Sequence, residues 1–274
     1  MNQREADEIR QNVRNSYAEV AEASAAGESC GVESSCCGVA AEPGLNAVSS
    51  VRMGYSEEDV SGVPQGADMG LGCGNPRAIA SLQPGEVVLD LGSGGGFDAF
   101  LAVMEVGQSG KVIGVDMTPV MISKSRMNAE QAGHANVEFR LGEIEYLPVA
   151  DEAVDIIISN CVINLSPEKP RVFREAMRVL RPGGRLAISD VVASTELPED
   201  IKNDLALYSG CMAGASIIDE LTDMMTAAGF DDITITPKDG SKEFIKDWAP
   251  GRGVEDYVLS AYIEAVKPGK TACC

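Results

Sequence analysis

The sequence predicts a doubly wound α/β fold, in which a mostly parallel sheet carries helices on both faces. Short apolar runs alternate with longer segments of helical spacing from residue 87 onward. Parallel strands need long crossover connections, so such alternation builds a parallel sheet. A glycine-rich turn at residues 92–96 separates the first strand from the helix after it, and 274 residues are enough to bury a large core.

The elements follow one another in a regular order. The predicted strands are residues 87–92, 111–116, 137–142, 154–160, 185–192, 233–237 and 258–266. The predicted helices are residues 97–106, 119–132, 168–180 and 217–228. Residues 181–184, Arg-Pro-Gly-Gly, are expected to form a tight turn. The two closing strands predict a hairpin inserted at one edge, which gives a sheet of seven strands.

The domain organisation is predicted to have three parts. Residues 1–45 hold a polar helix over residues 2–22 and a mobile cysteine-bearing arm, because residues 24–43 have too little apolar bulk to form a core. Residues 46–268 form the folded domain, in which the insertion 193–216 is long enough to fold over the sheet as a lid. Residues 269–274 are a tail that ends in two cysteines.

The net charge and the composition limit the classes of partner that the protein is expected to bind. The formal net charge of −20 disfavours nucleic acid and anionic lipid as partners, because their phosphates would be repelled. No apolar run reaches the length of a membrane span, and the N-terminus lacks a signal peptide pattern, so we expect a cytoplasmic protein. Eight cysteines in a reducing compartment indicate metal, redox or nucleophile chemistry, whereas the single histidine, His134, gives no support for a histidine-based site.

The turn after the first strand has the residues of a cofactor site. Residues 87–98 read VVLDLGSGGGFD. The dinucleotide pattern G-x-G-x-x-G, counted from Gly92, requires glycine where Phe97 stands. The carboxylate of Asp90 would repel a pyrophosphate, whereas S-adenosylmethionine carries an ammonium and a sulfonium. Charge therefore favours S-adenosylmethionine as the cofactor.

Residues after the next two strands support this interpretation. Asp116 ends the second strand about twenty residues past the glycine turn, where doubly wound folds hydrogen-bond a ribose. Met117 is expected to form a wall for the adenine. Glu143 and Ile144 follow the third strand and are expected to approach the edge of the adenine.

Three cysteines fall in loops that a parallel sheet would bring to one crevice. Cys73 lies in a glycine-rich loop, Cys161 directly follows the fourth strand, and Cys211 lies in the insertion. Thiolates bind thiophilic atoms. Zinc is one option, although the chain has no C-x-x-C spacing. Trivalent arsenic is another, because it takes three sulfur ligands and keeps a lone pair that can accept a methyl group without a general base.

These residues carry a specific resemblance. The chain resembles the arsenite S-adenosylmethionine methyltransferases, which belong to the Rossmann-like class I methyltransferases. The motifs, over roughly residues 50–215, are MGLGCGNP at 69–76, LDLGSGGGFDAFLA at 89–102, GKVIGVDMTP at 110–119, SNCVINLSP at 159–167, LRPGGRLAISD at 180–190 and SGCMAGA at 209–215. The two motifs that contain Cys73 and Cys161 are the most specific.

The resemblance implies roles for individual residues. It implies that Cys73, Cys161 and Cys211 bind trivalent arsenic. It implies that the cofactor is held by Asp90, Gly92, Ser93, Gly94 and Asp116, with Glu143 and Ile144 at its adenine and Asn160 near its methionine part.

The resemblance also implies a redox cycle. Methyl transfer oxidises arsenic, and a disulfide between Cys73 and an N-terminal cysteine would return it to the trivalent state. Cys37 is the favoured partner, with Cys36 next and Cys30 as a further candidate. A thioredoxin- or glutathione-type reductant would then reset the enzyme. Cys273 and Cys274 could capture arsenic or have no role.

Two other functions compete with this one. A small-molecule C- or O-methyltransferase of the same fold would keep the cofactor site but tolerate serine at Cys161 and Cys211. A non-catalytic metalloid-binding protein would need the thiols but not the cofactor. The intact acids and glycine turn argue against the second.

Overall fold

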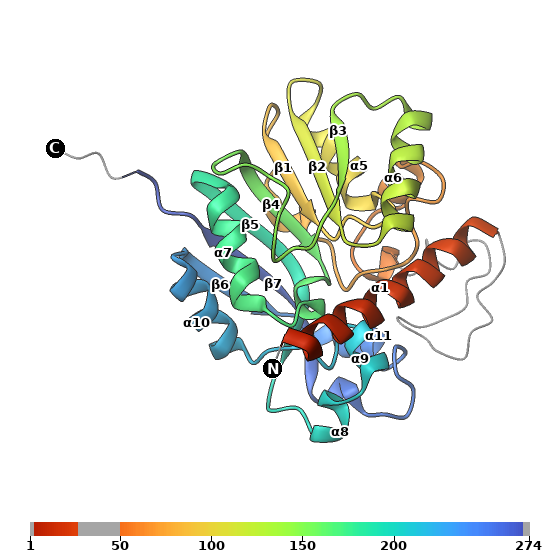
Figure 1. Cartoon of the computed structure of the whole chain (residues 1–274), viewed down its shortest axis with the longest axis vertical. Coiled ribbons are helices and arrows are strands. Elements are labelled where there is room, and N and C mark those ends of the chain that lie inside the picture. Colours follow the sequence, from red (N-terminus) through yellow and green to blue (C-terminus); the bar gives the residue numbers. More distant parts are fainter. Residues whose placement is uncertain (1–2, 27–49, 271–274) are drawn as a thin grey trace.

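The predicted α/β architecture is confirmed. The computed structural model describes residues 3–26 and 50–270. One sheet has the strand order β3-β2-β1-β4-β5-β7-β6, with helices on both faces (Figure 1). The strands are β1 (Val87–Leu91), β2 (Lys111–Asp116), β3 (Val137–Leu141), β4 (Val154–Asn160), β5 (Leu180–Ala193), β6 (Asp231–Pro237) and β7 (Val258–Val266). The first five strands pair in parallel, whereas β7 is antiparallel to both β5 and β6, which is the predicted edge hairpin.

The helices agree closely with the predicted ones where the apolar spacing is strong. They are α1 (Gln3–Ala26), α3 (Glu57–Gly62), α4 (Arg77–Ala80), α5 (Phe97–Val106), α6 (Pro119–Ala132), α7 (Lys169–Val179), α8 (Glu199–Lys202), α9 (Leu205–Ser209), α10 (Ile218–Ala228) and α11 (Lys242–Ile245). The short helices α3, α4, α8, α9 and α11 were not predicted, because four to six residues carry too little periodicity. No helix within the described ranges is both long and apolar enough to cross a membrane.

Strand alternation divides the core into two layers. Val88, Val112 and Ile156 face α4 and α5, and the adjacent Leu89, Ile113 and Ile157 face α7 and α10. A third apolar cluster lies at one end of the sheet, where α1, α9 and α11 meet the three predicted cysteines (Figure 1). The sheet therefore places the cysteines where the core is closed by helices from both ends of the chain.

The prediction of a tight turn at residues 181–184 is wrong. These residues lie inside β5, which begins at Leu180. Val154 pairs with Leu180 but Ile156 pairs with Arg185, so the extra residues of β5 form a bulge, with Gly183 at φ +81°. The Gly183 N–H donates to Lys267 O at 2.9 Å, which keeps this segment bonded beyond β7 instead of turning away.

The N-terminal helix is longer than predicted. It continues to Ala26, so residues 24–26, which the sequence assigns to the arm, are helical. The Asn12 side chain donates to Ser209 Oγ at 3.2 Å and Tyr17 OH donates to Ser209 O at 3.3 Å, which fixes α1 against the insertion 193–216. Cys30, Cys36, Cys37, Cys273 and Cys274 lie outside the described residues, so the arm and tail stay predictions.

Candidate functional site

The glycine turn between β1 and α5 exposes bare backbone because side chains have no room there. Gly92 has φ +70°, and a Cβ on it would lie 2.3 Å from Val162 Cγ2. Gly96 has φ +96°, and its Cβ would lie 2.6 Å from the Phe100 ring. Only glycine combines these backbone angles with such close approach. A ligand can therefore contact the main chain directly.

Asp116, at the carboxyl end of β2, holds this turn in place. Its Oδ2 accepts a hydrogen bond from Gly94 N at 3.0 Å, and its Oδ1 accepts one from Thr118 N at 2.8 Å. Each carboxylate oxygen has two lone pairs, so both oxygens can still accept from a ligand hydroxyl. The predicted ribose position is thus compatible with a second, structural role.

A crevice that opens to solvent lies between this turn and α1, and its space together with the solvent at its mouth is about 1060 Å³. Most predicted cofactor residues line it: Asp90, Gly92, Ser93, Gly94, Asp116, Met117, Ile144 and Asn160. Glu143 does not line it, because its carboxylate turns to Arg14 at 3.2 Å. Arg10, Val13 and Tyr17 of α1 also line it, and the sequence did not predict their role.

The electrostatics of the crevice favour a cationic ligand. Asp90 Oδ2 and Ser93 Oγ are buried without a hydrogen-bond partner among the described residues. Burial, followed by the charges of Asp98 and Asp116, raises the pKa of Asp90 well above its usual value. Burial likewise raises the pKa of Asp98 to about 6. A ligand with positive charge would relieve this cost, and the ammonium and sulfonium of S-adenosylmethionine fit it.

Asn160, the last residue of β4, joins the crevice to the loop that carries Cys73. Its Nδ2 donates to Gly74 O at 2.8 Å and to Tyr55 OH at 2.9 Å, and its Oδ1 accepts from Cys73 N at 3.0 Å. Tyr55 OH in turn donates to Asp98 Oδ1 at 2.6 Å. One side chain thus connects the acidic wall of the crevice with the first predicted thiol.

The three predicted cysteines come together. Cys161 lines the crevice and has φ +59°, and Cys211 has φ +64°, so both residues adopt a left-handed backbone that is uncommon outside glycine. The Cys211 thiol donates to Cys161 O at 2.6 Å, the Cys73 and Cys161 sulfurs lie within 4.8 Å of each other, and the Cys161 thiol interacts electrostatically with both other thiols. All three cysteines are buried. Three loops far apart in the chain therefore present thiols to one point beside the crevice.

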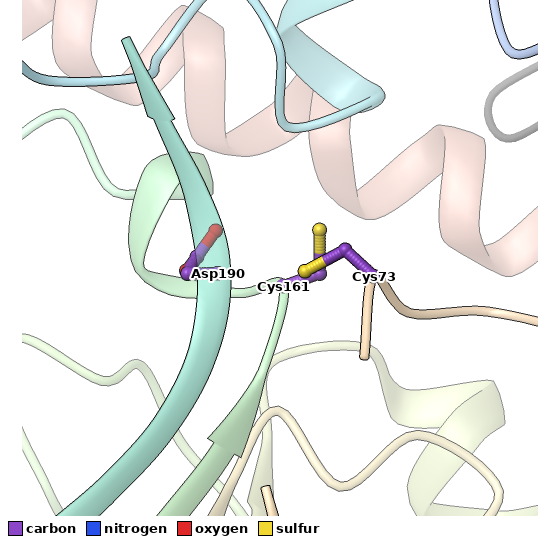
Figure 2. A group of neighbouring side chains, drawn as sticks. All are labelled: Cys73, Cys161 and Asp190. Atoms are coloured by element: carbon purple, nitrogen blue, oxygen red, sulfur yellow. The ribbon is translucent and has the colours of Figure 1, made fainter. Parts of the chain in front are cut away.

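A carboxylate accompanies the thiols. Cys73 Sγ, Cys161 Sγ and a carboxylate oxygen of Asp190 lie within 4.8 Å of one another (Figure 2). Asp190 lies near the carboxyl end of β5, the same kind of position that led to Asp90 and Asp116. Asp190 was not among the predicted site residues, although it too follows an apolar run at the end of a predicted strand.

The surroundings of Cys161 and Cys211 raise the pKa of both thiols, which favours their protonated form in the free protein. Hydrogen bonds from Cys211 and then Cys73, together with burial, raise the pKa of Cys161 well above its usual value. The hydrogen bond with Cys161 lowers the pKa of Cys211, but burial and the charges of Asp190 and Cys73 outweigh it, so that pKa is also raised. The cluster is thus suited to a ligand that displaces protons and forms strong bonds to sulfur.

A crevice of this kind, at the carboxyl ends of a sheet with one antiparallel strand beside the edge, is that of the class I S-adenosylmethionine-dependent methyltransferases. A family model described as "Methyltransferase domain" matches residues 82–229. The cofactor of the chain is accordingly S-adenosylmethionine.

Similarity to individual proteins narrows this class. The arsenite methyltransferase of Halobacterium salinarum is 53% identical over 271 residues, which are 97% of this chain and 68% of that protein. The mouse arsenite methyltransferase is 37% identical over 83% of this chain and 59% of its own length. The arsenic(III) S-adenosylmethionine methyltransferase structure from Chlamydomonas reinhardtii superposes with a TM-score of 0.61 at 32% identity, covering 83% of this chain and 75% of that one. The chain belongs to the arsenite methyltransferase family.

Proposed function

We propose that the chain methylates trivalent arsenic while Cys73, Cys161 and Cys211 hold it as thiolates. The observation that carries this proposal is the position of Cys161. Cys161 lines the crevice, and its thiol interacts with the thiols of both Cys73 and Cys211. A substrate bound through sulfur at this point lies next to the methyl donor.

Arsenic needs no general base, and the described residues that line the crevice include carboxylates but no histidine. Arsenite exchanges its three hydroxyl groups for three thiolates, and each thiol proton leaves with a hydroxyl as water. The arsenic keeps its lone pair, which supplies the two electrons of the new carbon–arsenic bond. S-adenosylmethionine, when bound, offers an electrophilic methyl group on its sulfonium. The residues of this chain then need only to orient the arsenic and exclude water.

The second half of the proposed cycle restores trivalent arsenic. Methyl transfer raises its formal state by two electrons, and oxidation of two thiols to a disulfide returns them. We propose that Cys73 pairs with a cysteine of the arm, with Cys37 favoured over Cys36. A thiol reductant, either a dithiol of the thioredoxin type or two molecules of a monothiol of the glutathione type, would then reduce the disulfide by exchange and become a disulfide itself.

The test compares wild type with Cys161→Ser and Cys211→Ser in turnover of arsenite with S-adenosylmethionine and a thiol reductant. We expect each substitution to lower methylated arsenic at least about a hundredfold, since a hydroxyl is a poor ligand for a thiophilic atom. Binding of S-adenosylmethionine by calorimetry should stay within a few-fold of wild type, which controls for folding.

Other outcomes identify the competing functions. Cofactor binding without any arsenic methylation by wild type would indicate a C- or O-methyltransferase, and serine would then be tolerated. Arsenic binding without cofactor binding would indicate a metalloid-binding protein.

A further inference from the structure

The carboxylate of Asp190 has no part in the chemistry proposed above. Trivalent arsenic takes three sulfur ligands, and the three thiols provide them. Asp190 is nevertheless buried, with 1% of its surface exposed, and one of its oxygens lies within 4.8 Å of both the Cys73 and Cys161 sulfurs. Figure 2 shows Asp190 on one side of the cluster and the Cys73 backbone on the other, with the two sulfur atoms between them. A buried oxygen ligand thus stands beside two sulfur ligands.

The fold holds this carboxylate firmly. Its Oδ1 accepts from Val191 N at 2.7 Å and from Asn164 Nδ2 at 2.9 Å, and its Oδ2 accepts from Ile163 N at 2.8 Å. The two hydrogen bonds to Oδ1 occupy both of its lone pairs, and the single one to Oδ2 leaves a lone pair there for a cation. Carboxylates that bind metals are commonly oriented by hydrogen bonds of this kind, so the ligand is already in place before a cation arrives.

We propose that Cys73, Cys161 and Asp190 form a site for a thiophilic divalent cation, Zn²⁺ or Cd²⁺, that overlaps the arsenic site and blocks it. Such cations accept mixed sulfur and carboxylate ligands in tetrahedral geometry. On binding, the two thiols release their protons to solvent and the cation replaces them. The blocking of arsenic rests on the proposed function, whereas the cation site itself does not.

Bond lengths support this ligand set. Zinc bonds of about 2.3 Å to sulfur and about 2.0–2.2 Å to carboxylate oxygen place tetrahedral ligands roughly 3.5–3.8 Å apart. The separations of up to 4.8 Å in the free cluster therefore have to close by about 1 Å or a little more, which rotation of the cysteine side chains can provide. Water or Cys211 would complete the coordination.

The two ligands make different demands on the cluster, and this separates them experimentally. Arsenic needs Cys211 but not Asp190. The divalent cation needs Asp190, whereas Cys211 is replaceable by water. Asp190→Asn should therefore weaken mainly the binding of the divalent cation, and Cys211→Ser should weaken mainly the binding of arsenite.

The experiment measures Cd²⁺ binding from its ultraviolet charge-transfer absorption with sulfur, in competition with a chelator, and arsenite binding by calorimetry. All proteins carry serine at Cys30, Cys36, Cys37, Cys273 and Cys274, so that only the described thiols remain. We expect Asp190→Asn to weaken Cd²⁺ at least about tenfold and arsenite less than about threefold. Cys211→Ser should abolish arsenite binding and weaken Cd²⁺ less than about tenfold. Asp219→Asn, an exposed acid on α10, is the matched control and should change neither affinity.

Each outcome bears on the cation site. Unchanged Cd²⁺ affinity in Asp190→Asn, or equal losses of both ligands in each variant, would overturn it. If Asp190→Asn does not fold, retention of Cd²⁺ with loss of arsenite in Cys211→Ser supports the site, and loss of both refutes it. If wild type binds Cd²⁺ but not arsenite, the proposed function fails and the cation site stands. A further measurement tests whether the cation blocks arsenic. Zn²⁺ should inhibit turnover, and added arsenite should relieve this inhibition.

Discussion

Gly92 and Gly107 both have a positive φ but different surroundings. Their φ angles are +70° and +66°. A Cβ on Gly92 would lie 2.3 Å from Val162, whereas a Cβ on Gly107 would meet nothing within 4 Å. The strain of a side chain at positive φ is therefore shared, and the clash with Val162 is specific to Gly92. Comparing alanine substitutions at the two positions therefore distinguishes backbone strain from the clash with Val162.

We expect Gly92→Ala to abolish cofactor binding, because the clash displaces the turn or the Val162 side chain. The destabilisation by Gly92→Ala should exceed that by Gly107→Ala by about 1–3 kcal/mol, because an alanine at position 107 carries backbone strain but no clash. The measurements are urea unfolding and calorimetric binding of S-adenosylmethionine. Equal losses of stability in the two variants, with binding retained, would contradict the assignment.

At the residue scale the sequence identifies residues that line the crevice where the end of a predicted strand marks them. Asp90 and Asp116 follow buried apolar runs, and both line the crevice. Asp98 lies on α5 with no such marker, and its role depends on Tyr55 and Asn160, which only folding brings near. Glu143 also follows a strand, but its carboxylate is directed away from the crevice because it binds Arg14 of α1. Position at the end of a strand thus predicts which residues lie near the crevice. The orientation of their side chains depends on partners that are distant in sequence.

At the element scale, helix α1 forms part of the cofactor site. Arg10 is buried, and its guanidinium bonds Glu145 at 3.1 Å and Glu168 at 2.5 Å. Glu145 follows β3 and lines the crevice, so the pair ties α1 to the wall opposite the glycine turn. The sequence predicts the helix but not this role, since its spacing is weak and its partners lie about 130–160 residues away.

We expect Arg10→Met to weaken S-adenosylmethionine binding about tenfold or more and to lower stability by about 3–5 kcal/mol, because Glu145 is left buried without its cation. Arg4→Met is the matched control on the same helix. Arg4 pairs with Glu8 in solvent, so its loss should cost less than about 1 kcal/mol and leave binding unchanged. Hydrogen exchange should show faster exchange throughout α1 in the first variant alone. Similar exchange in both would mean that α1 is held mainly by its apolar contacts.

At the scale of the whole molecule, the fold is predictable and the site only partly so. Apolar alternation reports burial against a neighbouring layer, and this local signal is enough for the strand and helix order. The bulge in β5 departs from it because the Gly183 N–H bonds Lys267 O, just beyond the end of the pairing between β5 and β7 at Arg185 and Val266. The meeting of Cys73, Cys161 and Cys211 depends on three loops at one end of the sheet, which the rule for parallel sheets predicts as a location but not as contacts.

The pH dependence of stability follows from the buried carboxyl groups of the free protein. Burial raises the pKa of both Asp98 and Asp190 to about 6, above the ordinary value of about 3.8 that each has when unfolded. The folded state therefore binds more protons than the unfolded state between these values, so stability rises as pH falls through 6. Each group contributes up to about 3 kcal/mol. Salt-bridged groups act in the opposite sense below pH 4.5, since the hydrogen bond from Arg178 lowers the pKa of Glu175.

The cofactor-free protein should therefore be most stable near pH 5. Urea unfolding at pH 8, 7, 6 and 5 measures this, and Asp98→Asn should reduce the gain on acidification. Saturating S-adenosylmethionine should stabilise the protein less at pH 5 than at pH 8, because its positive charge favours the ionised carboxylates that acid removes. A steady loss of stability from pH 8 to pH 5, in the free protein and in Asp98→Asn alike, would show that these carboxyl groups keep ordinary pKa values in the fold. The same acids that make the empty crevice unfavourable at neutral pH would then not be the source of its preference for a cation.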